Sequence, residues 1–372
     1  MKKKEKVGVV TLFNCYNYGA VLQAYATCKF LEKLGYNDVE LVNYENKYES
    51  KLKKTIPYIF SGNVKDAIKR TIQFVFFGKN RHLKKGFKEF CNSLKKSTKK
   101  YKNTEDLKKT NYDILISGSD QIWNPVIFGK LDLNYLLDFS STANKLSISA
   151  SAGSYHYSLE EKKEVVRCLK KYKAIAVREE SLKAQLQDSI DDIFVSVDPT
   201  LLLSKEDWIK ALPSNNKYGE ENSNYVLIYI VDANLKNYSE EIRILKEKIN
   251  KPIWMITPYK YKMKYIDKNI VSATPNDFIS LFKNAEFVIT NSFHGVIFST
   301  NFMKKFVALE NHKNPVRVHD YLSGIGIENR IVKNADDAQK INLDEINFEY
   351  YNTLMKIVEK TKNWIGDKIV EK

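Results

Sequence analysis

Cysteine and arginine are scarce in this sequence, and each scarcity excludes a class of function. Cys15, Cys28, Cys91 and Cys168 are scattered and include no Cys-x-x-Cys pair, which argues against a zinc site and a disulfide framework. The net charge of +15 comes from lysine, whereas nucleic-acid readers usually rely on the planar fork of arginine. With no recognised nucleic-acid motif either, we expect no nucleic-acid partner. A spread lysine excess is typical of a solvated surface, although it could attract acidic lipids or phosphorylated substrates.

Long apolar runs and a dinucleotide-binding loop are also missing. No run reaches the length of a membrane-spanning helix, and the apolar run after the opening lysines is too short for a signal peptide. We therefore expect a cytoplasmic protein and leave open peripheral contact between its basic surface and the inner face of the plasma membrane. The polar turn at residues 14–19 ends in glycine but is not G-x-G-x-x-G, so no nicotinamide or flavin site is predicted.

Strand-like and helix-like segments alternate along the chain. Residues 7–13 predict a buried strand, residues 20–34 a helix and residues 39–44 the next strand, so the chain opens with a βαβ unit. The same alternation resumes with a strand at residues 225–230, after a polar, glycine-containing stretch. This pattern predicts an α/β protein with two doubly wound, Rossmann-like lobes.

The polar stretch marks the junction between the two predicted lobes. Residues 1–200 are expected to form the N-terminal Rossmann-like lobe, which carries a lysine-rich helical insert at about 46–108. Residues 201–372 are expected to form the C-terminal Rossmann-like lobe, whose last segment, 352–369, has the spacing of one amphipathic helix.

The strongest functional signal is a strand, a polar turn and a helix start within residues 284–306. Free backbone N–H groups at a helix start can bind an anion, and Ser292 adds a hydroxyl there. His294 adds a side chain that can give or take a proton near neutral pH, and Gly295 permits close approach to the backbone. The alternative is that Ser292 is only a helix cap and His294 only a polar residue at a helix entry.

Two further polar turns follow strands of the N-terminal lobe. After the strand that ends at Ile116, Asp120 can hydrogen-bond sugar hydroxyls and Trp123 offers a flat apolar face, although a capped turn around a buried tryptophan is equally consistent. Arg178 follows a short strand, where side chains face the ligand crevice of an open sheet. Its planar fork matches a carboxylate or a phosphate, and a structural ion pair with a neighbouring glutamate is the alternative.

Six segments, in this order and spacing, resemble the polysaccharide pyruvyl transferases: FNCYNYGAVLQAYA, DILISGSDQIWNP, AVREES, VDPTLLL, NAEFVITNSFHGVIFS and RVHDYLSGIGIENRI. The similarity runs from Val7 to about Val332 and is weakest across the basic insert. It implies a fold like that of the two-lobed GT-B glycosyltransferases. Members transfer the enolpyruvyl unit of phosphoenolpyruvate to sugar hydroxyls and leave a cyclic pyruvate ketal. The acceptors are usually units of capsule or exopolysaccharide, often on lipid carriers, and no metal or organic cofactor is implied.

The resemblance assigns roles to residues of these segments. His294 becomes the candidate acid for the methylene carbon of phosphoenolpyruvate, and Arg178 the candidate clamp for its carboxylate or phosphate. Asp120 is a candidate base or orienter for the acceptor hydroxyl. The remaining substrate-binding candidates are Asn17, Tyr18, Gly19, Ser292, Gly295 and Arg317, of which Arg317 is equally consistent with a surface residue. The alternative functions are a GT-B-type glycosyltransferase that uses a nucleotide sugar in exopolysaccharide synthesis, and a non-catalytic sugar- or lipid-carrier-binding protein.

Overall fold

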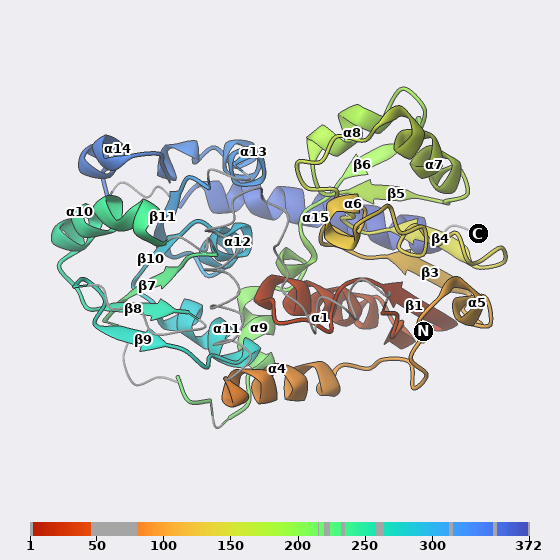
Figure 1. Cartoon of the computed structure of the whole chain (residues 1–372), viewed down its shortest axis with the longest axis horizontal. Coiled ribbons are helices and arrows are strands. Elements are labelled where there is room, and N and C mark those ends of the chain that lie inside the picture. Colours follow the sequence, from red (N-terminus) through yellow and green to blue (C-terminus); the bar gives the residue numbers. More distant parts are fainter. Residues whose placement is uncertain are drawn as a thin grey trace. The chain divides into compact units, whose positions relative to one another are not determined.

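The computed structural model describes residues 3–45, 80–214, 216–218, 224–231, 235–257, 264–311, 315–344 and 348–370. These residues belong to two compact units, each of which is an α/β structure (Figure 1). Unit 1 comprises Met1–Thr55, Cys91–Leu203 and Met355–Lys372, and unit 2 comprises Ile56–Phe90 and Ser204–Leu354. The last part of the C-terminal helix therefore groups with unit 1, although its sequence position suggested the second lobe. Residues 46–79 of the predicted insert lie outside the described residues.

The sheet of unit 1 has four parallel strands in the order β2-β1-β3-β4. They are β1 (Lys3–Val10), β2 (Tyr36–Leu41), β3 (Ile114–Ser117) and β4 (Asn144–Ser147). The register aligns Leu41, Val9, Ile116 and Leu146 across the sheet. Beyond β4, the parallel pair β5 (Ile175–Val177) and β6 (Ile193–Val195) continues the layer through isolated bridges such as Ala150 to Val177. Because the chain order turns back at β1, the topological switch point lies between β1 and β3, where such sheets bind ligands.

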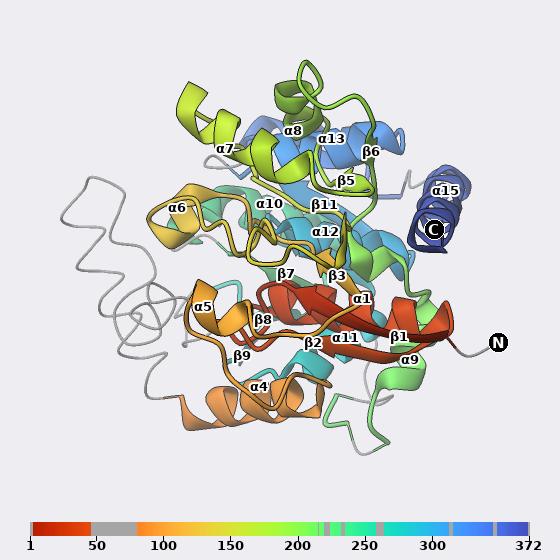
Figure 2. The same cartoon turned by 90° about the vertical axis from the view of Figure 1, so that its right-hand side faces the viewer.

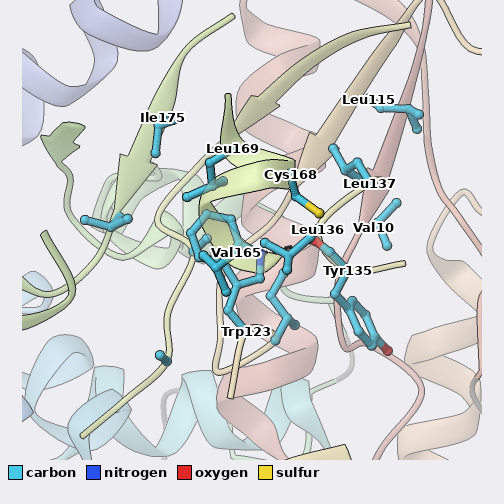
Figure 3. Packing of buried hydrophobic residues seen from close by; sticks show 14 of the residues in the cluster. Val10, Leu115, Trp123, Tyr135, Leu136, Leu137, Val165, Cys168, Leu169 and Ile175 are labelled. Atoms are coloured by element: carbon cyan, nitrogen blue, oxygen red, sulfur yellow. Dashed lines mark hydrogen bonds between the residues drawn. The ribbon is translucent and has the colours of Figure 1, made fainter. Parts of the chain in front are cut away.

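Four helices of unit 1 contribute side chains to one apolar cluster on this layer: α5 (Thr104–Leu107), α6 (Pro125–Phe128), α7 (Leu159–Leu169) and α8 (Glu180–Leu186). Helix α1 (Tyr18–Lys33) also belongs to this unit, whereas α4 (Arg81–Ser93) begins in unit 2 and ends in unit 1. Figure 3 shows Trp123 of the turn after β3 against Leu136 and Cys168, with Val10 of β1 nearby. The strands and helices that alternate along the sequence thus enclose an apolar core.

The C-terminal helix α15 (Tyr350–Val370), seen nearly end-on in Figure 2, packs its second half within unit 1. The ring of Trp364 stacks on that of Phe194, with centroids 4.9 Å apart, and Tyr36 Oη donates to the carbonyl oxygen of Ile369 at 3.4 Å. The helix therefore links β6 to β2 within this unit. Among the described residues, no helix combines the length and the apolar character needed to cross a membrane.

The sheet of unit 2 has six parallel strands in the order β12-β11-β10-β7-β8-β9. They are β7 (Val226–Tyr229), β8 (Ile253–Ile256), β9 (Lys268–Ile270), β10 (Phe287–Thr290), β11 (Lys305–Leu309) and β12 (Ile331–Val332). The helices are α9 (Lys205–Ala211), α10 (Ser239–Ile249), α11 (Pro275–Asn284), α12 (Phe293–Asn301), α13 (Val316–Gly324) and α14 (Ala335–Lys340). The chain leaves β7 in one direction and returns at β10 to continue in the other. The switch point of this unit therefore lies between β7 and β10.

Candidate functional site

The first turn of α12 lies directly after β10, at the switch point of unit 2. Ser292 is its N-cap: its Oγ accepts from Gly295 N at 3.4 Å, and its carbonyl oxygen accepts from Val296 N at 2.9 Å. Because this cap starts the helix at Phe293, His294 and Gly295 belong to the first helical turn and not to a turn before it. Ser292 thus caps the helix, as the alternative proposed.

Gly295 is required by the packing of α12 against β10. A Cβ at this position would overlap Thr290 Oγ1 and lie 2.9 Å from Thr290 Cβ. Thr290 cannot turn away easily, because its hydroxyl donates to the carbonyl oxygen of Tyr229 at 2.6 Å and accepts from Ser292 N at 3.1 Å. The glycine therefore permits close contact between the helix start and the end of the strand.

His294 and Arg317 come together through the ring of Phe293. The imidazole of His294 is buried and lies edge-on to Phe293, with ring centroids 5.5 Å apart. Arg317, on α13, places its Cζ 5.5 Å from the centroid of the same ring, and Tyr321 packs on it from one turn further along. Four predicted residues, Ser292, His294, Gly295 and Arg317, thus gather at the start of α12. The role of Arg317 as an anion contact stays a prediction.

A second histidine, which the predictions left out, lies on the same helix as Arg317. His319 follows Arg317 on α13, and its Nε2 lies 3.0 Å from Oε1 of Glu310, the residue after β11. A carboxylate partner fixes the orientation of an imidazole ring, as in many proton-transfer sites. The sequence signal was present in the segment RVHDYLSGIGIENRI, which contains both Arg317 and His319. What it did not indicate was that Glu310 would face the histidine.

The first turn of unit 1 is tied to the end of β3. Asn17 is the N-cap of α1, and its Oδ1 accepts from Ala20 N at 3.3 Å, with Tyr18 and Gly19 as the first helical residues. The buried Gln23 of α1 donates to Thr11 Oγ1 at 2.9 Å, and Thr11 in turn donates to the carbonyl oxygen of Ser119 at 2.7 Å. This chain of bonds joins α1, β1 and β3 at the switch point.

The two residues predicted in the turn after β3 have different surroundings: Trp123 lies in the core, whereas Asp120 is half-buried. Trp123 is fully buried, and its indole N–H is shared by Ser117 Oγ at 3.0 Å and the carbonyl oxygen of Tyr135 at 3.2 Å (Figure 3). The reading of Trp123 as a flat face for a sugar is therefore wrong, because the ring fills the core. Asp120 is half-buried and has the left-handed backbone angle φ 72°. Such a conformation in a non-glycine residue is uncommon and occurs often at functional sites.

Arg178 is held inside unit 1 by three acceptors. Its Nε donates to Glu179 Oε1, its Nη1 to Asp198 Oδ2 and its Nη2 to Ser151 Oγ, each at 3.0 Å. Its side chain is 3% exposed. Burial opposes the charge, but the carboxylates of Glu179, Asp198 and Asp120 outweigh it and raise the pKa of Arg178 above its ordinary value. The contacts favour the structural ion pair over the anion clamp.

Comparison with known proteins yields a family and a fold. Residues 17–313 match the family model described as polysaccharide pyruvyl transferase. The chain is similar in structure to the UDP-GlcNAc 2-epimerase from Neisseria meningitidis bound to UDP-GlcNAc, with 12% identity, 99% of this chain and 100% of that chain covered, and a TM-score of 0.56. It is also similar to a putative UDP-N-acetylglucosamine 2-epimerase from Listeria monocytogenes, with 12% identity, 100% and 98% covered, and a TM-score of 0.53.

These structural likenesses concern the fold alone, because one fold supports many functions. They confirm the predicted class, two Rossmann-like lobes of the GT-B type. The comparison with curated proteins found no match.

Proposed function

We propose that this chain, which belongs to the polysaccharide pyruvyl transferase family, transfers the enolpyruvyl unit of phosphoenolpyruvate to a sugar. The sugar would belong to a cell-surface polysaccharide or its lipid-linked precursor, and the product would be a pyruvate ketal. The observation that carries the proposal beyond the family is the gathering of His294, Arg317 and the first turn of α12 after β10. In the proposed reaction, this group would supply both a proton donor and contacts for anions.

The donor substrate fits the chemistry at the start of α12. Phosphoenolpyruvate carries a carboxylate and a phosphate, and the N-terminus of a helix attracts anions through its free N–H groups and its dipole. The guanidinium of Arg317 supplies a fixed positive charge beside it, and guanidinium groups bind both anions in two-pronged fashion.

The reaction requires a proton to be added to the methylene carbon of phosphoenolpyruvate. Two sugar hydroxyls must then bond to the carbon next to it. His294 would give a proton to the methylene, which becomes the methyl group, and the neighbouring carbon becomes electrophilic. The first sugar hydroxyl bonds to that carbon and its proton returns to the enzyme. The carbon–oxygen bond to phosphate then breaks, and the second hydroxyl closes the ketal as its proton leaves with phosphate. Asp120 is the proposed group that orients the attacking hydroxyl.

Release of phosphate from phosphoenolpyruvate, dependent on an acceptor oligosaccharide, tests this function. We expect His294→Gln to lower kcat by about a hundredfold or more, with little change in the KM for phosphoenolpyruvate. His156→Gln, at an exposed histidine of unit 1, is the matched control and should behave as wild type. Release of a nucleoside diphosphate from a nucleotide sugar, without use of phosphoenolpyruvate, would instead identify a glycosyltransferase.

A parallel variant decides which histidine donates the proton. If His319→Gln abolishes turnover while His294→Gln retains it, the donor is His319, held by Glu310. If His294→Gln raises KM and leaves kcat unchanged, His294 contacts an anion and transfers no proton.

A further inference from the structure

The strands β3, β4 and β5 lie side by side in unit 1 (Figure 1), and polar residues follow each of them. Asp120 pairs with Ala150 in an isolated parallel bridge, Ala150 pairs with Val177, and Arg178 N donates to the carbonyl oxygen of Ala150 at 3.0 Å. The side chains of Ser151, Arg178 and Glu179 meet directly at this edge. Because all three strands are parallel, this is the carboxyl edge of the layer, where open α/β sheets bind their ligands.

The two carboxylate oxygens of Glu179 have different surroundings. Oε1 accepts from Ser151 Oγ at 2.6 Å and from Arg178 Nε at 3.0 Å. Oε2 is buried and has no hydrogen-bond donor among the residues that the structure describes, in a side chain only 3% exposed. An ionised carboxylate can only accept hydrogen bonds, and buried polar atoms are rarely left without one. The second oxygen is therefore the acceptor that a bound donor group would satisfy.

The neighbours of Glu179 are already committed elsewhere. The single hydroxyl proton of Ser151 goes to Glu179 Oε1, while Ser151 Oγ itself accepts from Gly153 N and Arg178 Nη2, each at 3.0 Å. Arg178 Nη1 is bonded to Asp198, whose other oxygen accepts from the backbone and hydroxyl of Thr200. Neither residue can turn to Oε2 without breaking a buried bond. Glu179 is also the N-cap of α8 but makes no side-chain cap bond, so its carboxylate is directed into this network.

The charge at this edge favours a neutral ligand over an anion. The guanidinium of Arg178 is ion-paired with two buried carboxylates, those of Glu179 and Asp198, and Asp120 lies at the end of the same layer, so the group carries excess negative charge. The phosphate and carboxylate of phosphoenolpyruvate would be repelled here, and neither has a hydrogen to donate near neutral pH. Ser119, next to Asp120, is fully buried, and its hydroxyl has no partner among the described residues either. A neutral ligand rich in hydroxyl groups matches both of these atoms.

We propose that Glu179 binds a hydroxyl of the acceptor sugar through Oε2, and that Arg178 and Ser151 are positioning residues that hold its carboxylate. The proposal rests on the proposed function and goes further, because it assigns the acceptor subsite to the carboxyl edge of unit 1. It also gives Arg178 a role that does not require it to touch phosphoenolpyruvate.

The test separates the acceptor from the donor in steady-state kinetics. The acceptor probe is the repeat-unit oligosaccharide of the surface polysaccharide from a strain that lacks this gene, which carries no ketal from this enzyme. In Glu179→Gln the retained carbonyl oxygen can still accept from Ser151 and Arg178, but an amide N–H₂ replaces Oε2. We expect the acceptor KM to rise roughly tenfold or more, while the KM for phosphoenolpyruvate stays within about twofold. Glu180→Gln, at the exposed neighbour on α8, should match wild type.

Two results of the kinetic experiment would overturn the inference, and a binding measurement provides a second test. An unchanged acceptor KM in Glu179→Gln would overturn the inference, as would an equal rise in both KM values together with a lower melting temperature, which indicates a structural role only. Calorimetric titration of the same oligosaccharide without phosphoenolpyruvate keeps the inference testable if the proposed transfer is not observed. Loss of that binding in Glu179→Gln, and not in Glu180→Gln, would support the subsite, and equal binding by both variants would refute it.

Discussion

Replacing Gly295 by alanine should show how strongly the start of α12 depends on close contact with β10. The added methyl group would overlap Thr290 Oγ1 and lie 2.9 Å from Thr290 Cβ and 3.0 Å from its Cγ2. Thr290 is anchored by hydrogen bonds to Tyr229 and Ser292. The helix start must therefore move away from the strand or the threonine must give up a buried bond.

The expected loss of stability follows from two opposing effects. Overpacking of a well-packed site costs about 1–3 kcal/mol, whereas alanine favours a helix over glycine by about 1 kcal/mol. Because the added methyl group would overlap the anchored Thr290, the cost should lie in the upper part of that range, about 2–3 kcal/mol, which leaves a net loss of about 1–2 kcal/mol. For a folding unit of 150–250 residues, each kcal/mol corresponds to a change in melting temperature of about 2–4 °C. Gly295→Ala should thus lower the melting temperature of its transition by about 2–8 °C. Because His294 is the preceding residue, kcat should also fall, since small displacements of a reacting group are costly.

Scanning calorimetry of four variants checks this reasoning. Gly324→Ala is the matched control: it is also a helical glycine, but nothing lies within 4 Å of a Cβ built there, so its melting temperature should be unchanged or slightly higher. Thr290→Ala removes two of the three close contacts. The double variant Gly295→Ala/Thr290→Ala should therefore lose less stability than the sum of the single variants, by about 1 kcal/mol. Additive losses, or a Gly295→Ala protein as stable as the control, would refute the steric argument.

Two further predictions concern charge and thiol reactivity in unit 1. The hydrogen bonds from Arg167, with that from Lys171, outweigh burial and hold the pKa of Asp138 below its ordinary value. Its stabilisation is therefore present above the unfolded-state pKa of about 3.9 and is lost as pH falls. Asp138→Asn should lower the melting temperature at pH 7 by an amount corresponding to about 1 kcal/mol. The difference from wild type should narrow progressively as the pH falls below about 4, and a difference that stays constant there would contradict this. Burial raises the pKa of Cys28 to about 12, whereas Cys15 is half-buried. Iodoacetamide at pH 8 should therefore alkylate Cys15 first by mass spectrometry, and comparable modification of Cys28 would show the reasoning to be wrong.

The order of elements was predictable because it depends on contiguous residues. The opening strand, helix and strand, predicted at 7–13, 20–34 and 39–44, are observed as β1, α1 and β2 within a few residues. The predicted first strand begins too late in the sequence. The prediction relied on apolar residues, whereas β1 begins with charged residues that pair with β2. It also included Thr11 at the strand end, whose hydroxyl instead reaches across to Ser119.

The candidate site was predictable only in part. Ser292, His294 and Gly295 are contiguous, so a single motif identified them together. Arg317 could be named but not located, because its contact with Phe293 depends on how α13 packs on α12. Glu310 and His319 were missed as a pair for the same reason: the bond between them joins the end of β11 to a different helix.

By itself, the sequence determined the family, the alternation of strands and helices, and the motifs from which the site is built, because these properties reside in short runs of neighbouring residues. Only the tertiary structure decided which polar groups face one another. Arg178 meets Ser151 and Asp198, which are 27 and 20 positions away in the chain, because the ends of β4 and β5 lie next to each other. Trp123 turns into the core for a similar reason, since the residues that receive its indole come from other segments. Hydrogen bonds and burial of this kind depend on strand register and layer packing, and a local pattern contains neither.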